Sequence, residues 1–143
     1  MRIGVVVSRF NSEVGDGLMH SCLPELLKLG VRETDVLIVS VPGALEIPLA
    51  LQKLAQSGRF DALIALGAVI RGETYHFEIV AGESARALMG LTVDESIALG
   101  NGILTVENEA QAWVRARRTE KDKGGDAAHA ALKMIEVKDR LSR

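Results

Sequence analysis

Residues 71–76 combine side chains from which a proton-transfer and anion-binding site can be built. A strongly apolar run ends here in Arg71, Gly72, Glu73, Thr74, Tyr75 and His76. Imidazole titrates near neutral pH, so His76 is a candidate proton carrier, the alternative being a solvated loop histidine. Gly72, Glu73 and Thr74 precede a predicted helix, whose first amides stabilise anions, although a simple loop also explains them.

Two further candidates, Phe10 and Glu46, also follow predicted strands. Phe10 stands between Arg9 and Asn11, a polar setting in which an aromatic residue is poorly explained as core. It is either a stacking platform for a planar ligand or a hydrophobic staple for the next helix. Glu46 begins a predicted helix, where the helix dipole alone also favours a carboxylate.

A basic cluster occurs later in the chain and comprises Arg115, Arg117, Arg118, Lys121 and Lys123. This cluster is either a site for a small anion or a solvated helix end and loop. The net charge of the whole chain is −2, which leaves no general attraction to nucleic acid or to an anionic membrane.

Several other kinds of site are not expected. His20 and His129 lie in predicted helices without the spacing of metal ligands, so we interpret them as surface or capping residues and expect no metal. Cys22 is the only cysteine, which excludes an internal disulfide, and we interpret it as a small buried hydrophobe. Neither GxGxxG nor GxxxxGKS/T occurs, so no dinucleotide fingerprint or Walker-type phosphate loop is predicted.

Four apolar runs predict the strands that would position these residues: 3–7, 36–41, 62–70 and, less regularly, Ile97 with 102–104. Apolar residues recur every three or four positions, as in helices, over 14–29, 47–55, 77–90 and 127–135. Asn108 with Gln111 resembles a capping box that opens one more helix. Pro24 is expected to kink or interrupt the first helix, and Gly30 and Gly58 are placed to end helices.

Strands that alternate with helices predict right-handed βαβ crossovers. We therefore expect a single α/β domain over residues 1–143, a three-layer sandwich with a central, mainly parallel, four-stranded sheet flanked by helices. In such folds ligands bind beyond the carboxyl ends of the strands. Phe10, Glu46 and residues 71–76 are therefore expected to face one crevice.

The composition supports a soluble domain of ordinary size. The chain has 143 residues, of which 48% are hydrophobic, 25% charged and only 3% aromatic, so the core must be aliphatic. The first residues, MRIGVVVSRFN, contain an apolar run that is too short for a signal peptide. No uninterrupted apolar run in the chain reaches the length of a membrane span. A cytoplasmic location is expected.

Six stretches together resemble the lumazine synthase family. They are SRFN at 8–11, VPGALEIP at 41–48, DALIALGAVIRGETYHFE at 61–78, GILT at 102–105, QAWVRA at 111–116 and DKGGDAA at 122–128. The resemblance implies a flavodoxin-like fold and a cofactor-free transferase of riboflavin biosynthesis. Such an enzyme condenses 5-amino-6-(ribitylamino)uracil with 3,4-dihydroxy-2-butanone 4-phosphate, giving 6,7-dimethyl-8-ribityllumazine, phosphate and water.

The resemblance also implies roles for individual residues. His76 would be the proton carrier and Phe10 the platform for the pyrimidine ring. The other contacts from the same chain would be Ala44 and Glu46 to the ribityl chain, Val69 and Ile70 to the ring through backbone groups, and Glu73 and Thr74 to the phosphate through amides. The family implies a homopentamer with sites between adjacent subunits, so Arg115 and Lys123 would come from the neighbour, with Arg115 on the phosphate.

The chain departs from the family pattern at several points. Leu45 and Asn101 stand where members commonly carry aromatic residues, so the part of the substrate-binding wall that Asn101 would supply from the neighbour differs, and residues 117–122 are unusually charged. The chain begins almost at its first predicted strand, without an extension that in many members joins a neighbour's sheet, which favours a pentamer over a larger shell. The alternatives to an enzyme are a flavin- or lumazine-binding protein without turnover, a structural shell subunit and a generic flavodoxin-like nucleotide binder.

Overall fold

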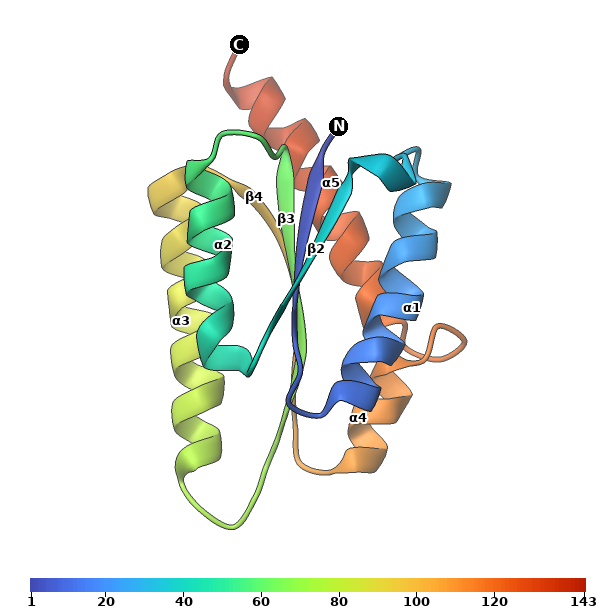
Figure 1. The fold of residues 1–143 in the computed structure, drawn as a ribbon, viewed down its shortest axis with the longest axis vertical. Helices are drawn as coiled ribbons and strands as arrows, with labels where there is room; N and C mark the ends of the chain where they lie inside the picture. Colours follow the sequence, from blue (N-terminus) through green and yellow to red (C-terminus); the bar gives the residue numbers. More distant parts are fainter.

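The computed structural model describes residues 1–143, in which strands alternate with helices (Figure 1). The strands are β1 (Ile3–Ser8), β2 (Val36–Val41), β3 (Ala62–Ile70) and β4 (Ala98–Val106). They form one sheet in the order β2-β1-β3-β4, and every neighbouring pair is parallel. The predicted α/β fold with a four-stranded parallel sheet is therefore confirmed.

Helices cover both faces of the sheet, as Figure 1 shows. One layer contains α1 (Ser12–Lys28), α4 (Glu109–Ala116) and α5 (Lys123–Leu141), and the other contains α2 (Ile47–Gln56) and α3 (His76–Glu95). Two short 3-10 turns, η1 (Glu33–Asp35) and η2 (Ala44–Glu46), precede β2 and α2. The strands all end at the lower edge of the molecule in the view of Figure 1, where the loops to α1, α3 and α4 begin.

The apolar runs of the sequence are explained by burial on both faces of the sheet. Val5 and Val7 of β1 pack against the α1, α4 and α5 layer, whereas Val6 packs against the α2 and α3 layer. The central strand β3 is buried from Ala62 to Val69, so none of these positions can carry a charged side chain without a large desolvation cost. Polar residues appear only where β3 leaves the sheet.

The helix boundaries confirm most of the local signals and correct one. Gly30 and Gly58 follow helix ends with positive φ angles of 99° and 70°, a conformation that glycine adopts without strain. The Asn108 side chain accepts a hydrogen bond from the Gln111 N–H, as a cap should. Pro24 was expected to kink or interrupt the first helix; it does not interrupt it, because α1 continues through Pro24 to Lys28. Proline has no backbone N–H, so the carbonyl of His20, four residues earlier, lacks its helical hydrogen bond. Pro24 and His20 are both exposed, so water can bind this carbonyl.

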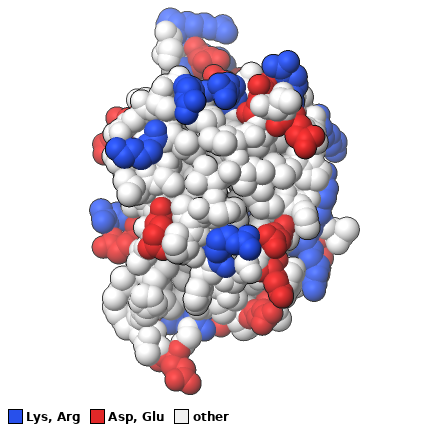
Figure 2. Space-filling view, viewed as in Figure 1, with Lys and Arg blue, Asp and Glu red and all other residues white.

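Part of the apolar surface is left uncovered. Leu37 and Ile38 on the edge strand β2 are 41% and 44% exposed, and Met89 and Val93 of α3 are exposed further still. In Figure 2 the middle of the face between α2 and α1 is largely uncharged, with acidic and basic side chains gathered around it. No helix combines the length and the apolar composition that a bilayer crossing requires.

Two glycines allow α5 to approach its neighbours closely. A Cβ atom on Gly124 would lie 2.2 Å from the Leu18 carbonyl oxygen of α1, and one on Gly100 would lie 2.0 Å from the Ala127 carbonyl oxygen. Both obstacles are backbone atoms, which cannot move aside as a flexible side chain would. The beginning of α5 can therefore pack directly against β4 and α1 only because Gly100 and Gly124 have no side chains.

Gly124→Ala is expected to lower the free energy of unfolding by about 2–3 kcal/mol, because the added methyl group must separate α5 from α1. Gly90→Ala is the matched control, since Gly90 lies inside α3 with no atom within 4 Å of the new Cβ. The control should be neutral or stabilising by about 0.5–1 kcal/mol. Urea unfolding at one protein concentration measures the free energy of unfolding of both variants. Equal changes in the two variants would contradict the close contact between α5 and α1.

Candidate active site

A cleft of about 560 Å³ lies beyond the carboxyl ends of β1, β2 and β3. This volume is in the range of small-molecule sites. It is lined by Phe10, Pro42, Gly43, Ala44, Leu45, Glu46, Ala68, Val69, Ile70, Gly72, Thr74, His76, Phe77 and Val80. The cleft therefore has a mainly apolar lining and brings together three segments of the chain, namely Phe10 and residues within 42–46 and 68–80.

The turn after β1 presents Phe10 to this cleft. The N–H groups of Arg9 and Phe10 donate to the carbonyls of Val41 and Pro42 at 2.8 and 2.9 Å, which extends the pairing with β2 past the strand end. Asn11 adopts a left-handed conformation with φ 59°, and its Nδ2 donates to the Ala68 carbonyl at 3.1 Å. The backbone around Phe10 is consequently held in place by hydrogen bonds, while the residue itself is 73% exposed. An exposed aromatic ring on a fixed backbone is suited to stacking on a planar ligand.

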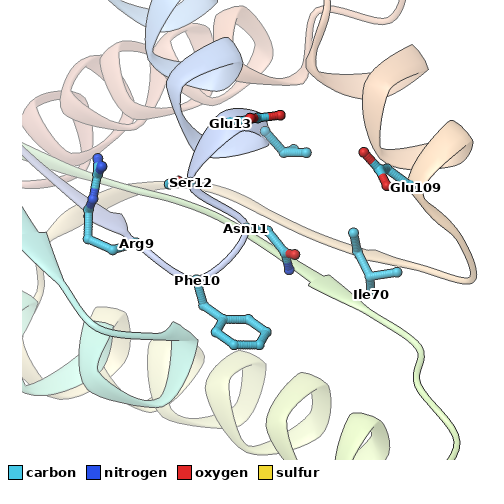
Figure 3. A pocket seen from close by; sticks show the side chains of 8 residues that line it. Arg9, Phe10, Asn11, Ser12, Glu13, Ile70 and Glu109 are labelled. Carbon is cyan, nitrogen blue, oxygen red and sulfur yellow. The ribbon is translucent and has the colours of Figure 1, made fainter.

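A second hollow, of about 370 Å³, lies on the other side of Phe10 (Figure 3). It is lined by Arg9, Phe10, Asn11, Ser12, Glu13, Val14, Ile70 and Glu109. Figure 3 shows the Phe10 ring pointing away from Glu13 and Glu109. We assign the ligand site to the larger cleft, which contains the ring face and the strand-end groups.

The wall opposite β3 is the η2 turn. Gly43 is extended, and its carbonyl accepts a hydrogen bond from the Glu46 N–H at 3.1 Å. This turn brings the Glu46 carboxylate back over the backbone, so that a Cβ on Gly43 would lie 3.1 Å from Glu46 Oε1. Glu46 makes no side-chain hydrogen bond within the chain, whereas Ala44 beside it is buried. The free carboxylate at the mouth of an apolar cleft can accept hydrogen bonds from hydroxyl groups of a ligand.

His76 begins α3 at the far end of the cleft. It is exposed, and its N–H approaches the Thr74 hydroxyl oxygen at 3.4 Å, whereas its ring makes no hydrogen bond within the chain. The preceding residues, Arg71 to Tyr75, are also exposed, which leaves backbone amides before α3 accessible to an anion. The ring nitrogens are free to exchange protons with a bound molecule.

Arg71, which the sequence analysis placed at the strand end without a role of its own, has a structural role in the site. Its guanidinium binds both Glu78 of α3 and Glu107 after β4, and it lies over the Phe77 ring, 4.4 Å from the ring centre. It therefore joins the end of β3 to the first turn of α3 and to the end of β4. The signal in the sequence was its position, directly after a buried strand and close to acidic residues.

The remaining predicted residues do not line the cleft of their own chain. Asn101 lies on the edge strand β4, where its Oδ1 accepts from the Ile103 N–H at 2.9 Å. Arg115 of α4 donates to the Gln111 carbonyl at 3.1 Å, and Lys123 of α5 lies 3.4 Å from Asp126. Glu73 belongs to the loop between Gly72 and Thr74 but is not part of the cleft wall.

Most residues of the basic cluster are engaged in ion pairs, some local and one with a distant helix. Arg117 binds Glu120, and Arg118 binds Glu25. Arg115 has no carboxylate partner, which leaves its charge available to a ligand. His129, interpreted from sequence as a surface or capping residue, is exposed on α5, and its Nε2 also contacts the Glu25 carboxylate at 2.8 Å.

Neither a metal cluster nor an activated thiol is present. No group of three or more His, Cys, Asp and Glu side chains is placed to hold a metal ion. Cys22 is buried, and desolvation, with a smaller contribution from the Asp122 charge, raises the pKa of its thiol to about 12. The thiol stays protonated and acts as core, as the sequence predicts.

The Arg71 contacts lead to a pH-dependent prediction. The hydrogen bond from Arg71 lowers the pKa of the Glu78 carboxyl. A carboxyl whose pKa is lowered in the folded state stabilises the fold above the unfolded pKa, about 4.3, and loses this contribution as pH falls through the folded value. Arg71→Met should therefore destabilise the protein at pH 6–7, and the difference from wild type should shrink between pH 4 and pH 3.

Urea unfolding across this pH range measures the Arg71 effect. Arg86→Met is the control, because Arg86 binds only Glu83, an exposed residue of the same helix. Its effect should be small throughout. A difference between Arg71→Met and wild type that stays constant down to pH 3 would contradict the role of the Glu78 contact.

Comparison with known proteins identifies the family. A family model described as 6,7-dimethyl-8-ribityllumazine synthase matches residues 1–139. Curated proteins of that name are 58% identical over 135 residues in Nitrosomonas europaea, 60% over 137 residues in Burkholderia multivorans and 55% over 137 residues in Cupriavidus metallidurans. These alignments cover 94–96% of this chain and 77–80% of the relatives. With the fold and the strand-end cleft in agreement, the chain belongs to the 6,7-dimethyl-8-ribityllumazine synthase family.

Proposed function

We propose that this chain catalyses the condensation for which its family is named, within riboflavin biosynthesis. The substrates are 5-amino-6-(ribitylamino)uracil and 3,4-dihydroxy-2-butanone 4-phosphate, and the products are 6,7-dimethyl-8-ribityllumazine, phosphate and water. One observation carries the proposal: a single cleft contains an exposed aromatic ring, a free carboxylate and an exposed histidine, namely Phe10, Glu46 and His76.

Each part of the cleft suits one part of the substrates. The ring of Phe10 would stack on the pyrimidine, and Ala44 and Glu46 would contact the ribityl chain. Backbone groups of Val69 and Ile70 would border the heterocycle. Thr74, with Glu73 beside it, would offer amides to the phosphate just before the first turn of α3.

The chemistry requires proton transfers and needs no protein nucleophile. The substrate amine attacks the ketone and forms an imine with loss of water; phosphate then leaves, and ring closure expels a second water. His76 would carry protons between these steps because its ring is exposed and unpaired at the end of the cleft. Holding two reactants together in one cleft can supply much of the remaining acceleration.

The proposal includes a homopentamer in the cytoplasm, with active sites between adjacent subunits. Arg115, Lys123 and Asn101 lie away from the cleft of their own chain, and Arg115 has no carboxylate partner, which supports a role in a neighbour's cleft. A guanidinium would match the phosphate oxygens of the second substrate with paired donors. Exposed apolar residues on β2 and α3, among them Ile38 and Val93, offer surface for subunit contacts.

The direct test is to mix purified protein with both substrates and to follow the fluorescent lumazine above the uncatalysed rate. Wild type should accelerate its formation, and His76→Asn should lower kcat on the order of 100-fold, the effect of losing a general acid–base group. His20→Asn is the control, because His20 is exposed on α1 and makes no side-chain hydrogen bond. Background rate from folded wild type would instead favour a lumazine-binding protein.

The shared site is tested by complementation. His76→Asn and Arg115→Met chains, each nearly inactive alone, are unfolded together and refolded as mixed oligomers. A cleft with intact His76 beside a neighbour with intact Arg115 should regain activity, in about a quarter of the sites of a random one-to-one mixture. His76→Asn mixed with Phe10→Ala should regain none, because both changes affect the same half of the site. Equal outcomes in the two mixtures would argue against a site between subunits.

A further inference from the structure

The segment between α4 and α5, residues 117–122, connects two cations, Arg115 and Lys123, that the proposed function places in a neighbour's cleft, with Arg115 on the phosphate. Arg115 lies just before this segment and Lys123 just after it. The segment contains a left-handed residue, Asp122, with φ 50°. Its conformation therefore determines how the two cations are spaced and aimed.

One carboxylate, that of Glu25 on α1, ties this segment to the body of the protein. Glu25 Oε2 accepts from Arg118 Nη2 at 2.9 Å, and Oε1 contacts His129 Nε2 of α5 at 2.8 Å. Arg118 Nη1 also donates to the Ser21 carbonyl at 2.9 Å. The Glu25 side chain is only 9% exposed, so α1, the segment and α5 meet at a nearly buried charge.

No other side chain of the segment reaches a distant part of the chain by a hydrogen bond. Arg117 pairs with Glu120 inside the segment and lies over the Trp113 ring of the adjoining helix, 5.5 Å from its centre. Thr119 and Lys121 make no side-chain hydrogen bond. Arg118 is therefore the one side chain of the segment itself that fixes it to α1. The flanking residues are held there separately, because the Ser21 hydroxyl donates to the Ala116 carbonyl at 2.9 Å and Gly124 packs against Leu18.

The hydrogen bond with His129, followed by those with Arg118, lowers the pKa of the Glu25 carboxyl, which is consequently ionised when the protein is active near neutral pH. Removing either Glu25 or Arg118 would leave the charge of the other without its ionic partner, and an unpaired charge near the protein interior is energetically unfavourable. The segment would then shift to rehydrate the remaining group, and Arg115 and Lys123 would shift with it.

We infer that Glu25 is a positioning residue, which acts through Arg118 to set the placement of Arg115 and Lys123 for the phosphate group of a substrate. The inference rests on the proposed function. Glu25 touches no substrate in this arrangement. Its effect is therefore expected on the recognition of phosphate and not on the proton transfers at His76.

The experiment compares neighbouring arginines that differ in their partners. Arg118→Met and Glu25→Met should each raise KM for the butanone phosphate on the order of tenfold, with KM for the ribitylaminouracil unchanged and kcat within about twofold of wild type. Arg117→Met removes the same charge from the same segment and should leave both KM values near wild type. Glu25→Gln keeps the shape of the side chain and should give a smaller change in the same direction. The double variant Glu25→Met/Arg118→Met should be no worse than either single change, because the two residues act as one unit.

A second readout needs no turnover: the rise in melting temperature that inorganic phosphate produces. Arg118→Met should lose most of this rise, and Arg117→Met should keep it. If the Arg118 and Arg117 variants behave alike in both readouts, or if Arg118→Met lowers only kcat and stability, the positioning role is overturned. A wild type that responds to phosphate without forming lumazine would count against the proposed function alone. If the single Met variants fail to fold, Glu25→Gln and the double variant, which leaves no unpaired buried charge, decide the question.

Discussion

The parallel direction of all four strands is the constraint on which the rest of this structure depends. A parallel sheet needs a helix over one of its faces in each connection, and the resulting layers bury β3 on both sides. Charged groups are excluded from the body of the sheet and collect where the strands end. The same geometry places the ends of β1, β2 and β3 around one cleft, so the pocket is a consequence of the strand direction and not of a separate folding event.

Much of this arrangement could be predicted because its signals are local. A strand buried on both faces must be continuously apolar, and the run 62–70 coincides with β3. The run 36–41 also coincides with a strand, the partly exposed edge strand β2. Phe10 and His76 stood out because an aromatic and a histidine directly follow strands. The end of α3 was harder to predict: the helix was expected to end at Gly90 but continues to Glu95. An exposed glycine inside a helix destabilises it by about 1 kcal/mol without ending it.

Contacts between distant charged residues could not be predicted from the sequence. Glu25 and His129 are 104 positions apart, and each reads as an ordinary helical surface residue until packing brings α1 and α5 together. Arg71 and Glu107 are 36 positions apart and meet only because β3 and β4 are neighbours in the sheet. The basic cluster looked uniform for the same reason. Packing gives Arg118 a distant carboxylate partner, Glu25, whereas Arg115 has no carboxylate partner.

The two helix layers are unequal, and this asymmetry bears on the order in which the molecule opens. The α1, α4 and α5 side contains a cluster of 20 buried apolar residues, whereas the α2 and α3 side contains 8. Along α3 only Ser84, Leu88 and Leu91 are buried, although this helix begins with His76. In a single chain, local unfolding should therefore start in the thinner layer, so that the cleft comes apart while the thicker layer still holds. The helix layer that contains His76, the proposed proton carrier, is thus also the layer of a single chain that burial stabilises least.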